Sequence, residues 1–312
     1  MIISGFTMVR NATKLYYPVK ASILSILPVV DEFVIALGDS DADDRTLQEI
    51  ESIGSPKIRV IRSAWDVKRF PGGAEYARQT DIAKGQCRGD WLFYLQSDEV
   101  VHEKYLPEIR RRCEALLHTP TVEGLLFRYR HFWGDYEHHI VSHAWYPREI
   151  RIIRNDPDIH SWRDAQSFRR IPDFDGVDYF RRTHTRKLRV AAVDAEIFHY
   201  GWVRPPGLMQ KKTVAFESHR LGGAEPVAPD AAPDAFNYGR IDRLKRFNGT
   251  HPAVMEDFIR RMSWADQLYP ANPRVIRHKH DRLKYRALTF VEQHFLRGNH
   301  IMGFKNYELI RV

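Results

Sequence analysis

The sequence predicts an α/β fold in which helices flank a mostly parallel central sheet. In the first half of the chain, short apolar runs alternate with segments whose apolar residues recur every three or four positions, the order expected when helices connect parallel strands. The run 90–97 is apolar almost throughout, as in strands buried on both faces. The chain has 312 residues, of which 43% are hydrophobic, enough for one large domain with an extension.

Strands and helices are expected to alternate up to residue 117. The strands are short runs of apolar and β-branched residues, and they cover 2–9, 32–37, 57–63 and 90–97. The helices place their apolar residues on one face, and they cover 15–27, 43–54, 72–87 and 103–117.

The pattern changes after residue 120. Further strands are expected without helices between them, at 122–129, 148–154, 188–193 and 196–200. Residues 222–235 are rich in Ala, Pro, Gly and Asp and read as a linker or surface loop. The predicted organisation is therefore a domain over 1–221, this linker, and a mainly helical extension over 236–312 with helices near 252–268 and 280–297.

The net charge of +8 fits an anionic substrate or a peripheral contact with an anionic membrane. Basic residues are interspersed with acidic ones rather than gathered in one stripe, which counts against nucleic-acid binding. Cys87 and Cys113 have no metal-ligand spacing, which fits a reducing compartment. No signal peptide or apolar run of membrane-spanning length is recognised. We expect a cytoplasmic protein, free or peripheral to the inner face of the membrane.

Carboxylates follow two of the predicted strands. Asp98 and Glu99 come directly after the run 90–97, so they should emerge where open α/β sheets bind ligands. Such a pair suits a divalent cation and, through it, a diphosphate. Asp39 and Asp41 follow the strand 32–37, and Asp39 is the better placed to bind a ribose or base.

Three later segments also carry candidate chemistry. His199 could complete a metal shell, and Lys211 and Lys212 further on could neutralise phosphates. Asp164 could act as a general base or be an ion-paired carboxylate, and Asp135 is a second candidate for the base.

The aromatic segment 131–146 is typical of a sugar-binding cleft, with Trp133, Tyr136 and Trp145 as stacking surfaces. An aromatic core is the rival interpretation. A third interpretation is a zinc cluster, whose ligands would be His131, His138, His139 and His143. The spacing of these histidines matches no zinc pattern.

Residues 2–215 together resemble a glycosyltransferase of the GT-A fold, similar to family 2. The resemblance rests on the strand ending in Val9-Arg10-Asn11-Ala12, the acidic turn 39–46, the helix through Tyr76-Ala77-Arg78-Gln79, Gln96-Ser97-Asp98-Glu99 at the position of the Asp-X-Asp motif, and His199-Tyr200-Gly201. Gln96 departs from this motif, because it replaces the first Asp.

The resemblance implies transfer of a sugar, with inversion, from a UDP- or GDP-linked donor to a glycan or lipid-linked acceptor in cell-surface polysaccharide synthesis. Asp98 and His199 would hold Mg²⁺ or Mn²⁺, and Asp164 or Asp135 would be the base. Trp133, Tyr136 and Trp145 would face the acceptor. The donor nucleotide would contact Thr7, Asn11, Asp39, Asp41, Gln79, Gln96, Ser97 and Lys211.

Other functions compete with this interpretation. A GT-A-like protein that binds a nucleotide or glycan without turnover is the main alternative. A nucleotidyltransferase would be expected to have a Gly-rich loop after the first strand, where residues 10–14 contain no glycine. The extension 236–312 could dimerise, cover the acceptor cleft or contact lipid.

Overall fold

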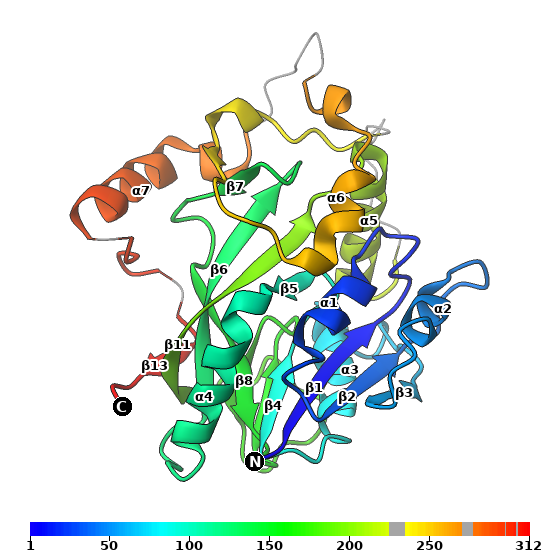
Figure 1. Ribbon diagram of the computed structural model, residues 1–312, viewed down its shortest axis with the longest axis vertical. Coiled ribbons are helices and arrows are strands. Elements are labelled where there is room, and N and C mark those ends of the chain that lie inside the picture. The colour runs from blue at the N-terminus through cyan, green and yellow to red at the C-terminus, as the bar shows by residue number, and fades with distance from the viewer. Residues whose placement is uncertain (225–234, 270–276, 297, 304) are drawn as a thin grey trace.

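A single mixed sheet organises the molecule, and its first part is parallel (Figure 1). The computed structural model describes residues 1–224, 235–269, 277–296, 298–303 and 305–312. The parallel part has the order β3-β2-β1-β4. Its strands are β1 (Ile3–Val9), β2 (Glu32–Leu37), β3 (Ile58–Arg62) and β4 (Trp91–Tyr94).

The second part of the sheet is mixed rather than mostly parallel, which corrects the prediction. Strand β8 (Arg148–Arg154) runs antiparallel to β4, and β6 (Gly124–Trp133) runs antiparallel to β8. Strand β11 (Arg186–Trp202) is parallel to β6. The sheet continues through β10 (Ser167–Arg170) and β9 (Ile159–Trp162), while β5 (Glu99–Val101), β7 (His138–Ile140), β12 (Lys245–Arg246) and β13 (Tyr307–Leu309) add short pairings.

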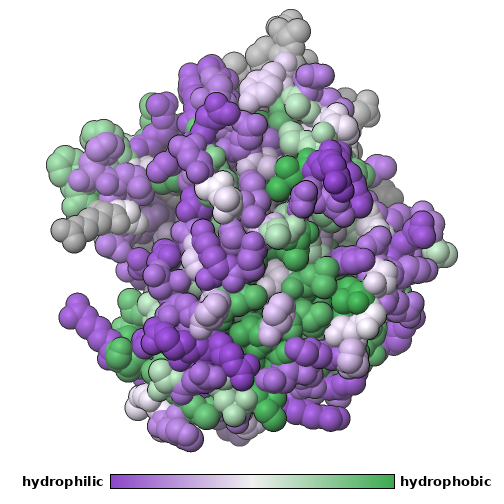
Figure 2. All heavy atoms as spheres, in the orientation of Figure 1, coloured by the Kyte–Doolittle hydropathy of each residue, from purple (hydrophilic) through white to green (hydrophobic). Residues whose placement is uncertain are grey.

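Helices cover both faces of the parallel part because successive strand residues point to opposite sides. Phe33, Ile35 and Leu37 of β2 share a core with α1 (Val19–Ile26) and α4 (Leu106–Leu116). Val34 and Ala36 lie in a second core with α3 (Ala74–Lys84). The short α2 (Thr46–Glu51) packs beside α1. Figure 2 shows hydrophobic side chains around α1, surrounded by mostly hydrophilic ones.

Local differences from the predicted elements have physical causes. Helix α1 begins at Val19 rather than residue 15, because proline disfavours helical geometry in the residue before it and Pro18 precedes Val19. The strands predicted at 188–193 and 196–200 form one strand, β11, which crosses a bulge between Ala192 and Glu196. Helix α5 (Pro206–Arg220) was not predicted, although proline at the first turn is compatible with a helix start.

The separate helical extension is not confirmed. Helices α6 (Glu256–Arg260) and α7 (Leu283–Phe295) are present, but the predicted helix 252–268 is reduced to α6 between 3₁₀ turns. Tyr238 and Trp264 share an aromatic core with β6 and β11, and β13 pairs with β11. Of the predicted linker, 225–234 lies outside the described residues. No described helix is long and apolar enough to cross a bilayer.

Candidate active site

A cavity of about 370 Å³ lies at the carboxyl ends of the parallel strands. Arg10 and Asn11 line it after β1, Trp65 after β3, and Gln96, Ser97 and Asp98 after β4. This is the edge at which open α/β sheets bind ligands. The wall opposite these strand ends includes one face of α5, contributed by Lys212, Ala215, Phe216 and His219.

Asp98 and His199 face each other in this cavity. Asp98 Oδ2 lies 3.8 Å from His199 Nε2, and both side chains are largely buried. Their elements meet because β5, which follows Asp98, pairs antiparallel with β11, which carries His199. The two side chains therefore come from backbone segments that the sheet holds in register.

A chain of hydrogen bonds fixes the tautomer of His199. The carbonyl of Tyr146 can only accept, so His131 Nε2, 2.8 Å away, must be the donor. Burial lowers the pKa of His131 to about 3, so this ring is neutral and its Nδ1 is an acceptor. His199 Nδ1, 3.0 Å away, must then donate to it. Burial lowers the pKa of His199 to about 4, so this ring is also neutral. Its Nε2, on the side facing Asp98, therefore carries a free lone pair.

The Asp98 carboxylate and His199 Nε2 are both hydrogen-bond acceptors, so a cation between or beside them stabilises their approach. Lys212 supplies one, with Nζ 3.5 Å from Asp98 Oδ2 and 2.7 Å from the Gly201 carbonyl. Burial lowers the pKa of Lys212 to about 7. Burial alone would raise the pKa of Asp98, but neighbouring positive charge, chiefly Lys212, outweighs it and lowers that pKa. The carboxylate is therefore ionised at neutral pH.

Gly201 leaves room for a ligand between these two groups. A Cβ on Gly201 would lie 2.5 Å from His199 Nε2 and 2.6 Å from Asp98 Oδ2. Its carbonyl accepts from Lys212 and, at 3.0 Å, from Arg204. A carboxylate oxygen and an imidazole lone pair beside such a space fit Mg²⁺ or Mn²⁺ as a partial shell.

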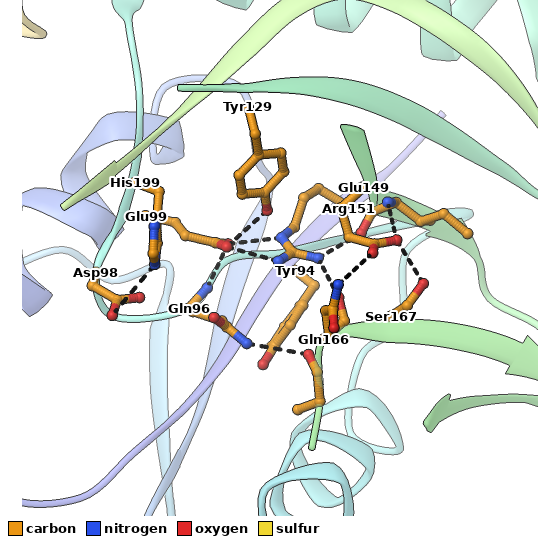
Figure 3. A network of polar contacts seen from close by, with 12 residues as sticks. Tyr94, Gln96, Asp98, Glu99, Tyr129, Glu149, Arg151, Gln166, Ser167 and His199 are labelled. Carbon is orange, nitrogen blue, oxygen red and sulfur yellow. Dashed lines mark hydrogen bonds and ion pairs between the residues drawn. The ribbon is translucent and has the colours of Figure 1, made fainter. Parts of the chain in front are cut away.

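Glu99 points away from the cavity, contrary to the idea of a shared carboxylate pair. Arg151 binds both of its oxygens at 2.7 Å, and Tyr129 Oη and the Gln96 backbone N–H complete its shell (Figure 3). Both Glu99 and Arg151 are fully buried. This ion pair joins β5 to β8 and leaves Asp98 as the carboxylate at the end of β4 that lines the cavity.

Gln96 connects the end of β4 to the loop that carries Asp164. Its Nε2 donates to the Ala165 carbonyl at 3.2 Å, a bond that an aspartate could not make because it has no N–H. Arg163 and Ala165, on either side of Asp164, have φ of 60° and 61°, a strained region for residues other than glycine. Burial raises the pKa of Asp164, which lines the cavity. A half-buried carboxylate with a raised pKa, held between two residues of strained backbone, suits proton abstraction.

Aromatic side chains line a further part of the cavity. Trp65 packs edge-on against Tyr76 at 5.2 Å between centroids, and both contact the ring of His219. Phe216 stacks on Tyr76 at 5.9 Å. Trp65 Nε1 is buried and has no hydrogen-bond partner among the described residues. The aromatic faces of this region can receive a planar group.

The structure gathers most of the predicted donor and metal residues but not all. One cavity is lined by Asn11, Gln96, Ser97, Asp98, Trp145, Asp164 and His199. Asp39 and Asp41 lie beside it, where Asp39 contacts Arg10 and accepts from the Trp65 N–H, and Asp41 pairs with Lys14.

Four predicted donor- or acceptor-binding residues lie away from the cavity. Thr7 is buried within β1. Gln79 is buried and bonds Ser63 and the Ala64 carbonyl, so it supports the Trp65 loop. Trp133 and Tyr136 belong to the aromatic core, 2% and 4% exposed, which is the rival interpretation of this segment.

Asp135 and Lys211 also lie away from the cavity. Asp135 Oδ1 caps the turn by accepting from the backbone N–H groups of Glu137 and His138, so it has no access to a substrate in the cavity. Lys211 lines a shallow pocket outside α5, whereas its neighbour Lys212 reaches Asp98.

Three residues of the cavity were not predicted from the sequence: Trp65, Phe216 and His219. Lys212, Phe216 and His219 are spaced at i, i+4 and i+7, which marks one helix face once α5 is recognised. Trp65 follows the third parallel strand, so the rule applied to Asp39 and Asp98 would have found it.

Comparisons with known proteins give only distant similarities. No protein-family model matches the chain, and no curated protein matches it. Among solved structures it is similar to S. aureus TarS (15% identity, 68% of this chain and 38% of that one, TM-score 0.38). It is also similar to TarS 1–349 (15%, 50% and 47%, 0.31) and to M. tuberculosis glucosyl-3-phosphoglycerate synthase in complex with Mn²⁺, UDP and glucosyl-3-phosphoglycerate (21%, 41% and 44%, 0.30).

The chain spans less than half the length of each of these three structures. At these identities and TM-scores, function has to be inferred from the residues of the cavity itself.

Proposed function

We propose that this protein is an inverting glycosyltransferase that moves a sugar from a nucleoside-diphosphate donor to a hydroxyl acceptor. The observation that carries the proposal is the pairing of Asp98 with the unprotonated Nε2 of His199 around a space kept open by Gly201. This pairing lies at the carboxyl edge of a parallel sheet, and Asp164 lines the same cavity.

The donor nucleotide fits the part of the cavity beside β1, β2 and β3. Asp39 can accept from a ribose hydroxyl or a base N–H, and Asn11 lines the adjoining wall. Trp65 offers an aromatic face to the base. Gln96 and Ser97 at the end of β4 border the path from the base to Asp98.

Asp98 and His199 would hold Mg²⁺ or Mn²⁺ on the diphosphate. A divalent cation there would stabilise the negative charge that develops on the leaving diphosphate. Lys212, whose Nζ lies 3.5 Å from the same Asp98 oxygen that faces His199, adds a positive charge to the same region. Gln96 reduces the number of carboxylate ligands but holds the Asp164 loop instead.

Asp164 is the base of this proposal. The acceptor hydroxyl oxygen forms a bond to the anomeric carbon while the bond to the diphosphate oxygen breaks on the opposite face. The hydroxyl proton passes to Asp164, and the bonding electrons leave with the diphosphate. The raised pKa of Asp164 brings it closer to neutral pH, where a base is more effective.

The acceptor is proposed to be a glycan or lipid-linked precursor of a cell-surface polysaccharide. Trp145 and Trp202 line the cavity and pack against each other at 5.6 Å, which gives a sugar ring an apolar surface. Exposed apolar side chains on α7, Leu283, Phe290 and Phe295, lie among basic residues and suit contact with anionic lipid. Flotation with phosphatidylglycerol vesicles tests this contact, which a Phe290→Ser, Phe295→Ser variant should lose.

The proposal is tested by calorimetric titration of UDP and GDP, with and without Mn²⁺, on the wild type and on Asp98→Ala. Metal-dependent binding of one nucleotide, lost in Asp98→Ala and retained in Lys211→Ala, supports the donor site. Absence of binding for both nucleotides with metal present contradicts it. Nucleotide binding without hydrolysis or transfer of any UDP- or GDP-sugar would favour a GT-A-like binding protein.

A further inference from the structure

A second group of metal-ligating side chains lies outside the active-site cavity. His143, Glu292 and His300 each offer one ligand atom, and these atoms lie within 4.8 Å of one another. They come from three separate places: the loop between β7 and β8, the buried face of α7, and the segment after α7. No sequence motif links them, because 149 residues separate His143 from Glu292.

Glu292 is the centre of this group. It is a carboxylate with no exposed surface on a helix that is otherwise mostly exposed. Its Oε1 accepts from the Ile301 N–H at 2.7 Å and lies 2.6 Å from His143 Nδ1. Its Oε2 is buried and has no hydrogen-bond partner among the described residues. A buried carboxylate oxygen without a partner costs free energy unless a cation or donor reaches it.

His300 is placed to share such a cation. Its Nε2 lies 3.6 Å from Glu292 Oε2, too far for a hydrogen bond. In a tetrahedral zinc shell, with bonds of about 2.0–2.1 Å, two ligand atoms lie about 3.3 Å apart. The separation of Nε2 and Oε2 is close to that value. The ligand atom of His143 lies within 4.8 Å of the other two, so all three can converge on one ion after small side-chain shifts.

We propose that His143, Glu292 and His300 form a zinc site that fastens α7 to the loop before β8. Two imidazoles and one carboxylate are a recognised zinc donor set that keeps a fourth position open. His300 lines two small cavities next to the triad, of about 280 and 190 Å³, which give that position room for water or a small ligand.

The site has a consequence for the cavity described above. His143 lies three residues before Tyr146, whose carbonyl sets the tautomer of His131 and, through it, of His199. A zinc ion on His143 would hold this loop at one end. The zinc ligands are therefore positioning residues for the loop, and none of them touches the active-site cavity.

Zinc binding is measured on the full chain carrying Asp98→Ala, which removes the first metal site. After chelation and dialysis, Zn²⁺ is titrated in competition with a chromophoric chelator. We expect one Zn²⁺ per chain, with affinity at least a hundredfold weaker in Glu292→Gln and in His300→Ala. His294→Ala is the matched control, because His294 lies on α7 but is exposed and outside the triad; its affinity should be unchanged.

Two further readouts keep the test decisive. His300 follows α7 rather than lying in the sheet core, so His300→Ala should fold even if Glu292→Gln does not. Co²⁺ should give a visible absorption band typical of tetrahedral sites that is absent in His300→Ala. Lack of zinc binding to the Asp98→Ala chain would overturn the proposal, and so would zinc affinities in the two triad variants equal to that of the parent Asp98→Ala chain. Neither result would affect the glycosyltransferase assignment.

Discussion

Replacing Gly201 by alanine adds a single methyl group and tests whether a metal ion binds between Asp98 and His199. The added Cβ would lie 2.5 Å from His199 Nε2 and 2.6 Å from Asp98 Oδ2, about 0.8–0.9 Å inside the 3.4 Å at which ordinary contacts begin. Gly201 is not in the left-handed region, so alanine adds no backbone strain. Because the methyl group fills the space between the two ligand atoms, the substitution should weaken metal binding.

The size of both effects follows from the local packing. Crowding two buried side chains should lower the free energy of unfolding by about 1–3 kcal/mol. Loss of the position between Asp98 and His199 should weaken Mn²⁺ binding at least about 100-fold, which corresponds to about 2.7 kcal/mol of binding free energy. Titration of Mn²⁺ monitored by electron paramagnetic resonance, in the presence of the nucleotide, gives the affinity directly. Urea unfolding gives the stability.

Gly85→Ala is a suitable control for the loss of a glycine. Gly85 ends α3 with φ of −63°, and its Cβ would lie 3.3 Å from the Asp81 carbonyl, outside the cavity. Its Mn²⁺ affinity should equal that of the wild type. If Gly201→Ala bound Mn²⁺ within about threefold of the wild type while folded, the placement of the cation between Asp98 and His199 would be refuted.

Three more predictions concern the charged side chains in and near the candidate active site. Lys212→Met should reduce affinity for the nucleoside diphosphate at least tenfold, whereas Lys211→Met should leave it unchanged; equal effects in calorimetry would argue against the orientation of α5. The kcat/KM profile should be bell-shaped, falling at low pH as Asp164 takes up its proton, and falling above about pH 7 as Lys212 loses its charge. An alkaline limb unchanged in Lys212→Met would contradict that assignment. Glu99→Gln should lower the free energy of unfolding by about 3–5 kcal/mol, because it leaves Arg151 buried without a counter-charge; a loss below about 1 kcal/mol in urea unfolding would show that the pair is not structural.

The first part of the fold was predictable because its signals are local. Each of the first four strands is a short apolar run followed by a turn. The first three match the structure within one residue at each end, and β4 ends three residues earlier than predicted. The mixed part was not predictable in the same way, since strand direction in β8 and β6 depends on partners far along the chain. No local pattern records that pairing.

In the candidate site, too, some residues were predictable from local sequence signals and others depend on contacts with distant residues. Asp98, His199 and Asp164 were predicted from strand ends and from a family resemblance, and one cavity contains all three. Both lysines were named as possible phosphate contacts, and only Lys211 was carried into the donor site. No helix was predicted there, and only helical periodicity distinguishes the two. Trp133 and Tyr136 have the composition of a sugar cleft, but burial decides their role, and burial depends on the distant residues Tyr238 and Trp264.

Lys212 gives the protein a built-in counter-ion at Asp98. Because this lysine already compensates the buried carboxylate, we expect the chain to fold without divalent metal. An ion that is not needed for folding is free to arrive with each donor and to depart with each product. Glu292 differs, since one of its oxygens has no such compensation among the described residues. An ion bound there would be a permanent constituent, so the two places should differ in how fast they exchange metal with the solution.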